Sequence, residues 1–275
     1  MNSNTNNTLI GNKYSLIEQI GKGQFGEIYK AENIRTHTFV AIKIEPIINE
    51  TKLLKNETKI YQYLNTSFKK GIGIPNVLWF GLDNKNYYMA IDLLGISLQE
   101  LREKHSSLSF SLNMISIISK QMIQRIQYIH TMKLIHRDIK PDNFLFGLKP
   151  SSNILFLIDY GLCKQYITNN GTHILNTTNK KIIGTPNFVS INIHNGSEPS
   201  RRDDLESVAY IMYYLWKGSL EWHKINNNND IINLKLSLMR DKSTPLFITN
   251  FFNYCRTLTF EELPDYNNIL NILNI

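Results

Sequence analysis

The sequence predicts an α+β fold with two lobes: a small N-terminal lobe with an antiparallel sheet and one main helix, and a larger helical C-terminal lobe. Short β-prone runs separated by turns fill most of residues 14–91. Stretches with apolar residues at helical spacing dominate residues 96–275. The pattern changes at residues 92–95, which we interpret as a hinge. Ligands often bind between two lobes, so a functional site is expected to use both.

Composition limits the classes of function. The chain has 275 residues, and its 42% hydrophobic content is enough for a substantial core. Lys and Arg exceed Asp and Glu by 30 to 23, a net charge of +7 that favours anionic partners. These basic residues are spread along the chain, so we expect no dedicated nucleic-acid site. Cys163 and Cys255 provide neither a disulfide framework nor metal-ligand spacing.

The N-terminal residues 1–13 are polar and lack the apolar core of a signal peptide. We expect them to form a disordered lead-in to a domain over residues 14–275. No apolar run reaches the ~20 residues that a membrane helix needs. The sequence therefore predicts a cytoplasmic or nuclear protein without membrane association, and we expect a monomer.

The first motif, IGKGQFGEIYKAE, places Gly21, Gly23 and Gly26 between two β-prone runs. Glycines at this spacing let backbone N–H groups approach phosphate oxygens. A dinucleotide site would need a helix after the glycines and an acidic residue about 20 positions on. Here a predicted strand follows instead, and then VAIK with Lys43. A glycine loop between antiparallel strands, followed by a strand lysine that contacts nucleotide phosphates, is the protein-kinase arrangement.

One amphipathic helix is predicted in the N-terminal lobe, over residues 51–64. Glu57 lies on its apolar face. A buried carboxylate without a partner is costly, so a cation should lie beside it. In the protein-kinase arrangement that cation is Lys43.

The stretch LIHRDIKPDNFLFG, residues 134–147, places six polar side chains between two apolar segments that are predicted to be short strands. A polar loop held at both ends by buried strands fixes side chains in space, as a catalytic or ion-binding loop requires. In the protein-kinase pattern Asp138 accepts the proton of the substrate hydroxyl, and Lys140 neutralises charge on the transferring phosphoryl group. We expect His136 to be structural rather than a general base.

The expected cofactors are ATP and Mg²⁺. Asn143 and Asp159, the latter in the run LIDYG, are the residues predicted to hold two Mg²⁺ ions. Phosphoryl transfer mainly requires placement and positive charge near developing negative charge. Lys43, Lys140 and the metal ions would supply that charge.

Two long helices are predicted in the C-terminal lobe. Residues 111–130 carry one apolar stripe, typical of a helix that faces the core. Residues 203–216 are apolar nearly all round after an acidic start, as expected of a buried helix whose acidic residues meet its dipole. The asparagine run at residues 226–229 predicts a loop.

From about Tyr14 to its C-terminus the chain resembles the casein kinase 1 family of serine/threonine protein kinases. The most specific similarities are SEPSRRDDLES at residues 197–207 and SIN at residues 190–192, where most protein kinases carry Ala-Pro-Glu. GIPNVLWFG, DLLGISLQEL and FNYCRTLTFEELPDY also resemble family segments. The resemblance implies transfer of the γ-phosphate of ATP to serine or threonine hydroxyls of protein substrates with acidic or phosphorylated segments. We expect activity without upstream phosphorylation.

The resemblance also implies roles for individual residues. Asp204 should hold the catalytic loop from below, and Thr185 should contact Asp138 and Lys140 and help select serine or threonine. Tyr160 stands where the family usually has Phe, and we expect no loss of activity because an aromatic ring remains. The expected nucleotide-binding residues, with Ile91 as gatekeeper and the backbones of Asp92 and Leu94 on the adenine, are Ile20, Gly21, Gly23, Gly26, Ile28, Ala41, Lys43, Ile91, Asp92 and Leu94.

One departure from the family concerns substrate choice. The family's GTARYAS carries an arginine that, with a distal lysine, binds a phosphate already on the substrate, whereas this sequence reads GTPNFVS with Pro186 and Asn187. A neutral Asn loses a charged, bidentate phosphate contact. Residues 226–235 offer no evident counterpart of the distal lysine, so both acidic and pre-phosphorylated substrates stay open. A second anion pocket is implied by the basic residues Arg137, Lys164 and Lys180, although Lys180 equally fits a solvated charge.

Other functions are weighed against this one. A catalytically silent pseudokinase that acts as a binding scaffold is the main alternative, but such proteins usually lose the strand lysine, the loop aspartate or the metal aspartate. Here Lys43, Asp138 and Asp159 are all present. A small-molecule kinase is disfavoured by the substrate-facing segment at residues 159–192.

Overall fold

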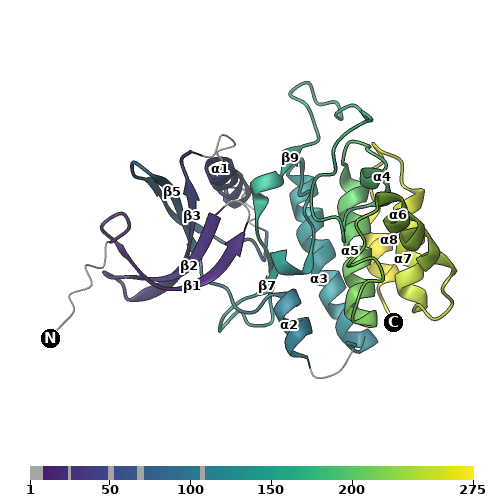
Figure 1. The fold of residues 1–275 in the computed structure, drawn as a ribbon, viewed down its shortest axis with the longest axis horizontal. Helices are drawn as coiled ribbons and strands as arrows, with labels where there is room; N and C mark the ends of the chain where they lie inside the picture. Colours follow the sequence, from purple (N-terminus) through teal and green to yellow (C-terminus); the bar gives the residue numbers. More distant parts are fainter. Residues whose placement is uncertain (1–8, 24–25, 49–52, 67–70, 106–108) are drawn as a thin grey trace.

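The computed structural model describes residues 9–23, 26–48, 53–66, 71–105 and 109–275. An antiparallel sheet with one helix forms the N-terminal part, and helices form most of the C-terminal part (Figure 1). The predicted α+β architecture with two lobes is therefore confirmed. Within these ranges, no helix has both the length and the hydropathy that crossing a membrane requires.

The N-terminal sheet has five strands in the order β1-β2-β3-β5-β4, and each neighbouring pair is antiparallel. Its strand register places Gly21 opposite Ile28, Ile28 opposite Lys43, and Lys43 opposite Met89. Residues that lie opposite one another point to the same face of a sheet, so this row faces one way. The strands are β1 (Tyr14–Gly23), β2 (Gly26–Asn33), β3 (Thr38–Pro46), β4 (Val77–Leu82) and β5 (Asn86–Asp92).

Helix α1 (Leu53–Asn65) packs against β3, β4 and β5. It buries Leu54, Tyr61 and Leu64 in the main hydrophobic core, together with Met89 of β5. The predicted helix over residues 51–64 is thus present, while residues 51–52 lie outside the described residues. The start of α1 is held by Glu45 of β3, whose carboxylate accepts the backbone N–H groups of Leu53 and Leu54 at 3.2 and 2.6 Å.

The prediction of a disordered lead-in over residues 1–13 is wrong for residues 9–13. Residues 1–8 lie outside the described residues, but residues 9–13 belong to the fold. Ile10 pairs with Tyr14 and is buried with it against Val40 and Ile42, on the face of the sheet opposite Lys43. An apolar side chain that covers this cluster gains enough burial to order the turn around it.

The C-terminal part is built around α5, which packs against α3 and α7 (Figure 1). Most of α5 is buried, in agreement with its apolar sequence. The helices are α2 (Leu98–Lys104), α3 (Leu112–Thr131), α4 (Ile191–His194), α5 (Arg201–Lys217), α6 (Asn228–Ser237), α7 (Leu246–Thr257) and α8 (Tyr266–Ile272).

The start of α5 differs from the prediction, which placed it at Asp203. The helix begins at Arg201, because Ser200 and Asp203 form a capping box one turn earlier. The carboxylate of Asp203 accepts the backbone N–H of Ser200 at 2.7 Å. The neighbouring Asp204 turns its carboxylate to another segment, so the two acidic residues do more than meet the helix dipole.

The asparagine run at residues 226–229 was predicted to be a loop, and this prediction is wrong for its second half. Helix α6 begins at Asn228, with Asn227 as its N-cap. The side chain of Asn227 accepts the N–H groups of Asn229 and Asp230 at 2.9 and 3.2 Å. Asparagine is among the strongest N-cap residues, so a polar run can start a helix as well as a loop.

Four short strands frame the loop between α3 and α5. They are β6 (Leu134–Ile135), β7 (Phe144–Phe146), β8 (Leu155–Leu157) and β9 (Lys164–Gln165), and they pair as β6 with β9 and β7 with β8. The apolar segments on both sides of HRDIKPDN are therefore the strands β6 and β7, as predicted. Two 3₁₀ turns, η1 (Pro141–Asn143) and η2 (Tyr160–Leu162), complete this region.

Candidate active site

The loop of residues 136–143 is held from below by Asp204 at the start of α5. The carboxylate of Asp204 accepts the backbone N–H groups of His136 and Arg137 at 2.7 and 2.9 Å, and it lies 3.0 Å from Nε2 of His130. Burial alone would raise its pKa, but these partners, His130 above all, hold the pKa below its usual value. Arg137 has a positive φ of 70°, a conformation that these two N–H bonds stabilise.

His136 is fully buried beneath this loop. Its Nε2 lies 3.0 Å from the carbonyl oxygen of Ile158, and its Nδ1 lies 3.3 Å from the backbone N–H of Asp138. A neutral imidazole with the proton on Nε2 satisfies both contacts, donating to Ile158 and accepting from Asp138. The residue therefore supports the loop from inside, as expected.

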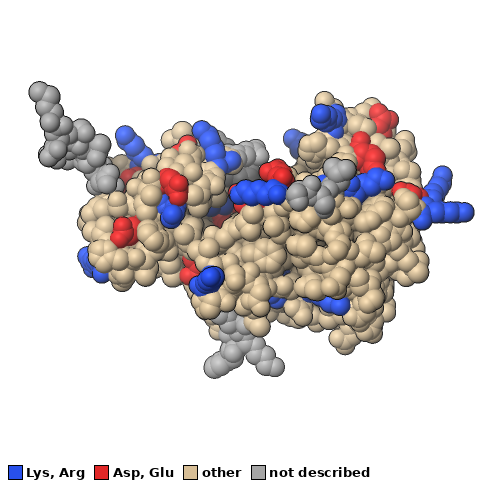
Figure 2. Space-filling model, turned by 90° about the horizontal axis from the view of Figure 1, so that it is seen from below, with Lys and Arg blue, Asp and Glu red and all other residues tan. Residues whose placement is uncertain are grey.

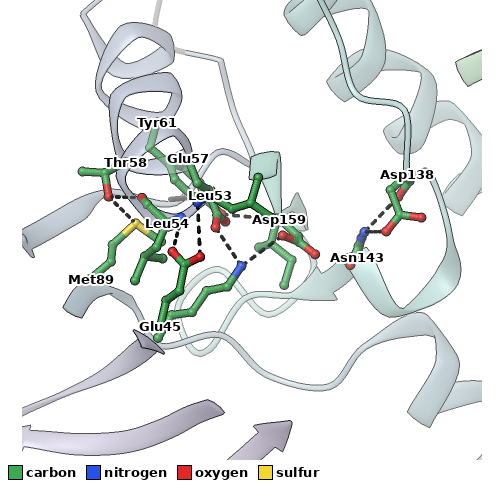
Figure 3. Close-up of polar contacts among 12 residues, drawn as sticks. Glu45, Leu53, Leu54, Glu57, Thr58, Tyr61, Met89, Asp138, Asn143 and Asp159 are labelled. Carbon is green, nitrogen blue, oxygen red and sulfur yellow. Dashed lines mark hydrogen bonds and ion pairs between the residues drawn. The ribbon is translucent and has the colours of Figure 1, made fainter. Parts of the chain in front are cut away.

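Three side chains contact Asp138. Thr185 Oγ1 donates to Oδ1 at 2.7 Å, and Lys140 Nζ lies 2.8 Å from Oδ2. Asn143 Nδ2 donates to the backbone oxygen of Asp138 at 2.8 Å and lies 3.4 Å from Oδ2 (Figure 3). The resemblance implied that Thr185 contacts both Asp138 and Lys140; here Thr185 and Lys140 meet on the same carboxylate.

Lys43 joins the sheet, α1 and the segment after β8. Its Nζ lies 2.7 Å from Oε2 of Glu57 and 3.0 Å from Oδ1 of Asp159. Figure 3 shows Asp159 between Glu57 on one side and the pair Asn143 and Asp138 on the other. The carboxylate that the sequence placed on the apolar face of α1 is 2% exposed and is paired with the predicted cation.

The charges of this group shift one another. Burial opposes the charged form of Lys43, but the two carboxylates outweigh burial and raise its pKa, so the ammonium stays protonated. Burial raises the pKa of Glu57 to about 7, although Lys43 acts in the opposite direction. Burial would also raise the pKa of Asp159, but Lys43 lowers it below its usual value. Asp159 is therefore ionised at neutral pH.

Tyr160 follows Asp159 and is fully buried. Its ring packs edge-on against Tyr61 of α1, with centroids 4.8 Å apart, and its hydroxyl donates to the carbonyl oxygen of Leu157 at 3.1 Å. The hydroxyl of Tyr61 in turn accepts the backbone N–H of Asp159 at 3.2 Å. The hydroxyl of Tyr160 is thus accommodated without a buried unpaired group.

The donor set of Asn143 and Asp159 fits a magnesium ion. The amide nitrogen of Asn143 faces Asp138, so its oxygen points the other way, and Lys43 occupies only one oxygen of Asp159. In the described part of the chain, no group of three or more His, Cys, Asp or Glu residues could hold a metal ion. Mg²⁺ does not require such a cage, because it is usually bound by one or two protein ligands with phosphate oxygens and waters.

The three glycines of the first motif have different surroundings. A side chain on Gly26, which has a φ of 155°, would place its Cβ 2.0 Å from the carbonyl oxygen of Ile44. For Gly23, in contrast, no atom of the described residues lies within 4 Å of where a Cβ would be, which suits a loop that approaches phosphates. Gly21 lies opposite Ile28 on β2, and the tip between Gly23 and Gly26 lies outside the described residues.

The remaining nucleotide-binding candidates lie on the sheet and the hinge. Ile91 of β5 is directly opposite the buried Ala41 of β3, two residues along the strand from Lys43. Ile20 is half-exposed at an irregularity in β1. The side chain of Asp92 turns back to Asn76, accepting its N–H and Nδ2–H groups at 2.8 and 2.7 Å.

The segment after β5 is partly exposed and pairs with β7 on one side. The N–H of Gly95 donates to the carbonyl oxygen of Phe146 at 2.7 Å, and the N–H of Phe146 donates to the carbonyl oxygen of Ile96 at 2.9 Å. Leu94 lies in this segment. The structure thus brings Leu94 and the loop of residues 136–143 to the same region, since that loop leads directly into β7, which ends at Phe146.

The two runs in which the resemblance is most specific, residues 190–192 and 197–207, contact each other. Ser190 Oγ donates to Oδ1 of Asp203 at 2.5 Å, and Asn192 Nδ2 lies 3.3 Å from the same oxygen. Burial raises the pKa of Asp203 to about 6, although Ser190 and other partners lower it. The segment from Thr185 to Asn192 is therefore tied to α5 beside the loop that carries Asp138.

Two of the three basic residues expected to form a second anion pocket, Lys164 and Lys180, contact the buried carboxylate of Glu198. Lys164 Nζ lies 2.8 Å from Oε1 of Glu198, and Lys180 Nζ lies 3.5 Å from Oε2. Glu198 is only 5% exposed. Burial would raise the pKa of Glu198, but Lys164, Lys180 and Arg137 hold it below its usual value. Lys180 is therefore not a purely solvated charge.

Several residues of the site were missed by the sequence interpretation. Glu45 caps α1, Tyr61 holds the backbone of Asp159, and Glu198 neutralises the basic cluster. Glu45 had a detectable signal, because it follows Lys43 by two positions on a strand and so shares its buried face. Glu198 had none, because its partners lie 34 and 18 positions away.

A family model described as protein kinase domain matches residues 14–257.

Proposed function

Because the chain belongs to the protein kinase domain family, we propose that it is an active serine/threonine protein kinase of casein kinase 1 type. The proposed reaction transfers the γ-phosphate of ATP to serine or threonine hydroxyls of protein substrates with acidic or phosphorylated segments. The observation that carries the proposal is the convergence of Thr185, Lys140 and Asn143 on Asp138, within one site with Lys43 and Asp159.

In the proposed mechanism, Asp138 accepts the proton of the substrate hydroxyl as that oxygen attacks the phosphoryl group. Lys140 lies at the same carboxylate and supplies positive charge beside the reacting oxygens. Lys43, held by Glu57, orients the phosphates from the other side. Asn143 and Asp159 would hold Mg²⁺, which when bound neutralises charge on the phosphates.

Selection of serine or threonine is proposed from the placement of Thr185. Its hydroxyl donates to Oδ1 of Asp138, the residue proposed to accept the substrate proton. The same segment continues through Ser190 to Asp203, and these residues belong to the two runs on which the resemblance to casein kinase 1 is most specific. Their direct hydrogen bond supports a casein kinase 1 type of substrate-facing segment.

Activity without upstream phosphorylation is proposed from the position of Glu198. In many kinases a phosphate on the activation loop orders basic residues. Here Lys164 and Lys180 already contact a buried carboxylate. We therefore expect freshly made protein to be active, and Glu198→Gln, which leaves the lysines without a charged partner, to lower kcat by about tenfold or more.

The substrate side carries no arginine at position 187. Asn187 Nδ2 instead lies 2.9 Å from Nδ1 of the exposed His223. Lys and Arg side chains are scattered over the face shown in Figure 2, several of them beside Asp or Glu. This distribution supports recognition of short acidic segments rather than of an extended polyanion.

The test uses purified protein with ATP and Mg²⁺ and matched peptides. One peptide carries acidic residues near a serine, one carries a phosphoserine three residues before it, and one carries tyrosine as the acceptor. We expect transfer to serine in the acidic peptide at least as good as in the phosphorylated one, and none to tyrosine. Bound nucleotide without transfer to any peptide would instead support the pseudokinase alternative.

A further inference from the structure

Lys235 is a buried lysine for which the phosphoryl-transfer mechanism has no use. It lies on α6, and its side chain is fully buried. Its Nζ lies 3.0 Å from the carbonyl oxygen of Pro186, 2.6 Å from that of Val189, and 3.0 Å from Nε2 of His194. An ammonium group has three N–H donors, so these three acceptors can satisfy it completely.

The acceptor role of His194 follows from its other contacts. Asn228 Nδ2 donates to the backbone oxygen of His194 at 3.1 Å, which directs Oδ1 of Asn228 towards the imidazole. His194 Nδ1 lies 2.6 Å from that oxygen and must donate to it. Nε2 then carries the lone pair that Lys235 contacts, and its 3.2 Å distance to the carbonyl oxygen of Pro186 is a contact between two acceptors that Lys235 bridges. Burial and the charge of Lys235 lower the pKa of His194 to about 4, so the imidazole stays neutral.

The surroundings of Lys235 favour a cation at this position. Its Nζ lies 4.3 and 5.5 Å from the ring centroids of Tyr210 and Trp222. Burial lowers the pKa of Lys235 to about 7, with Arg256 acting in the same direction and Glu206 in the opposite one. The two carbonyls, the imidazole and the ring faces also favour the charged form. A buried lysine is expensive and is expected only where its hydrogen bonds fix something else.

The two carbonyls belong to the segment that faces the substrate. Thr185 at its start donates to Asp138, and Ser190 at its end donates to Asp203. Between these two ends, the N–H groups of Phe188 and Val189 turn back to the carbonyl of Thr185. Lys235 binds the carbonyls of Pro186 and Val189 from beneath this turn.

We propose that Lys235 is a positioning residue: its ammonium holds the carbonyls of Pro186 and Val189 so that the turn of residues 185–189 keeps Thr185 against Asp138. This proposal rests on the proposed kinase function for its effect on catalysis. Lys235 is the last residue of the segment 226–235, in which the sequence offered no evident phosphate-binding lysine. Its ammonium lies inside the fold and is not presented at the surface beside Asn187.

The test compares Lys235→Met, which keeps the length of the side chain and removes its donors, with Lys224→Met, which removes an exposed lysine nearby. Amide hydrogen exchange over residues 185–194 should become faster in Lys235→Met only. The value of kcat/KM for a serine peptide should fall by about tenfold or more, whereas KM for ATP should change by less than about twofold. Lys235→Gln, which keeps N–H donors, should recover part of the loss.

The outcomes separate the two proposals. Faster exchange in Lys235→Met without phosphoryl transfer by the unmodified protein would leave the positioning role intact and contradict the kinase function. Unchanged exchange, or equal losses in peptide and ATP kinetics, would overturn the positioning role. The same holds if Lys235→Met and Lys235→Gln both fail to fold while Lys224→Met folds, because Lys235 would then serve overall stability.

Discussion

The ammonium nitrogen of Lys43 lies 2.7 Å from Oε2 of Glu57. This contact joins a strand of the sheet to α1, and Lys43 also reaches Asp159 after β8. A charge-assisted hydrogen bond at this distance is worth more than a neutral one, above all where one partner is buried. The position of Lys43, which we propose faces the nucleotide phosphates, therefore depends on α1.

Replacing Glu57 by Gln should weaken this dependence without changing the shape of the side chain. Gln accepts a hydrogen bond but carries no charge, so we expect kcat/KM for ATP to fall by about tenfold to a hundredfold. Steady-state kinetics at saturating peptide measure the effect. The control is Glu18→Gln, which removes a carboxylate from an exposed ion pair with Lys30 and should leave the kinetics unchanged.

The raised pKa of Glu57 predicts a pH dependence of activity. Burial raises this pKa to about 7, so acidification below about pH 7 neutralises Glu57 and leaves Lys43 paired with the carboxylate of Asp159 alone. We expect kcat/KM for ATP, which reports the free enzyme, to fall as the pH decreases through about 7. Glu57→Gln should lack this decrease, whereas titration of the nucleotide itself would remain in both proteins.

The titration of Glu57 should change the stability of the fold with pH in the direction opposite to its effect on activity. A carboxyl whose pKa is higher in the folded state than its ordinary 4.5 binds a proton more tightly when folded. The contribution of Glu57 to the free energy of unfolding therefore decreases as the pH rises from about 4.5 to about 7. Urea unfolding of the unmodified protein and Glu57→Gln at several pH values measures it; identical pH profiles would contradict the assignment.

Ser190→Ala should destabilise the protein because it removes a hydroxyl that donates to the buried carboxylate of Asp203. We expect a loss of about 1–3 kcal/mol in the free energy of unfolding. The matched control is Ser237→Ala on the exposed side of α6, for which a change within about 0.5 kcal/mol is expected. Equal effects of the two substitutions in urea unfolding would argue against the Ser190–Asp203 contact.

Tyr160→Phe should preserve activity and cost little stability. The variant removes only the hydroxyl that donates to Leu157, and it keeps the ring packed against Tyr61. A net loss of about 1 kcal/mol or less is expected, compared with about 3–5 kcal/mol for Tyr160→Ala, which leaves a cavity. Kinetic and unfolding measurements on both variants check this; a large loss of activity in Tyr160→Phe would show that the hydroxyl itself is required.

Much of the fold and site could be predicted because the determining patterns are local. Helical spacing placed Glu57 on the buried face of α1, and the apolar flanks of HRDIKPDN indicated β6 and β7. The missed features depend on contacts between distant segments. Nothing near Lys235 in the sequence indicates that it reaches Pro186, 49 positions away. Capping also shifted boundaries, as Ser200 did for α5 and Asn227 for α6.

The most direct test of the central claim is phosphoryl transfer by the unmodified protein and by Asp138→Asn. Both are incubated with ATP, Mg²⁺ and a serine peptide, and nucleotide binding is measured in parallel by thermal shift. We expect the unmodified protein to transfer phosphate and Asp138→Asn to be slower by about 10²–10⁴-fold with nucleotide binding retained. Equal rates, or nucleotide binding without transfer by the unmodified protein, would contradict the proposed role of Asp138.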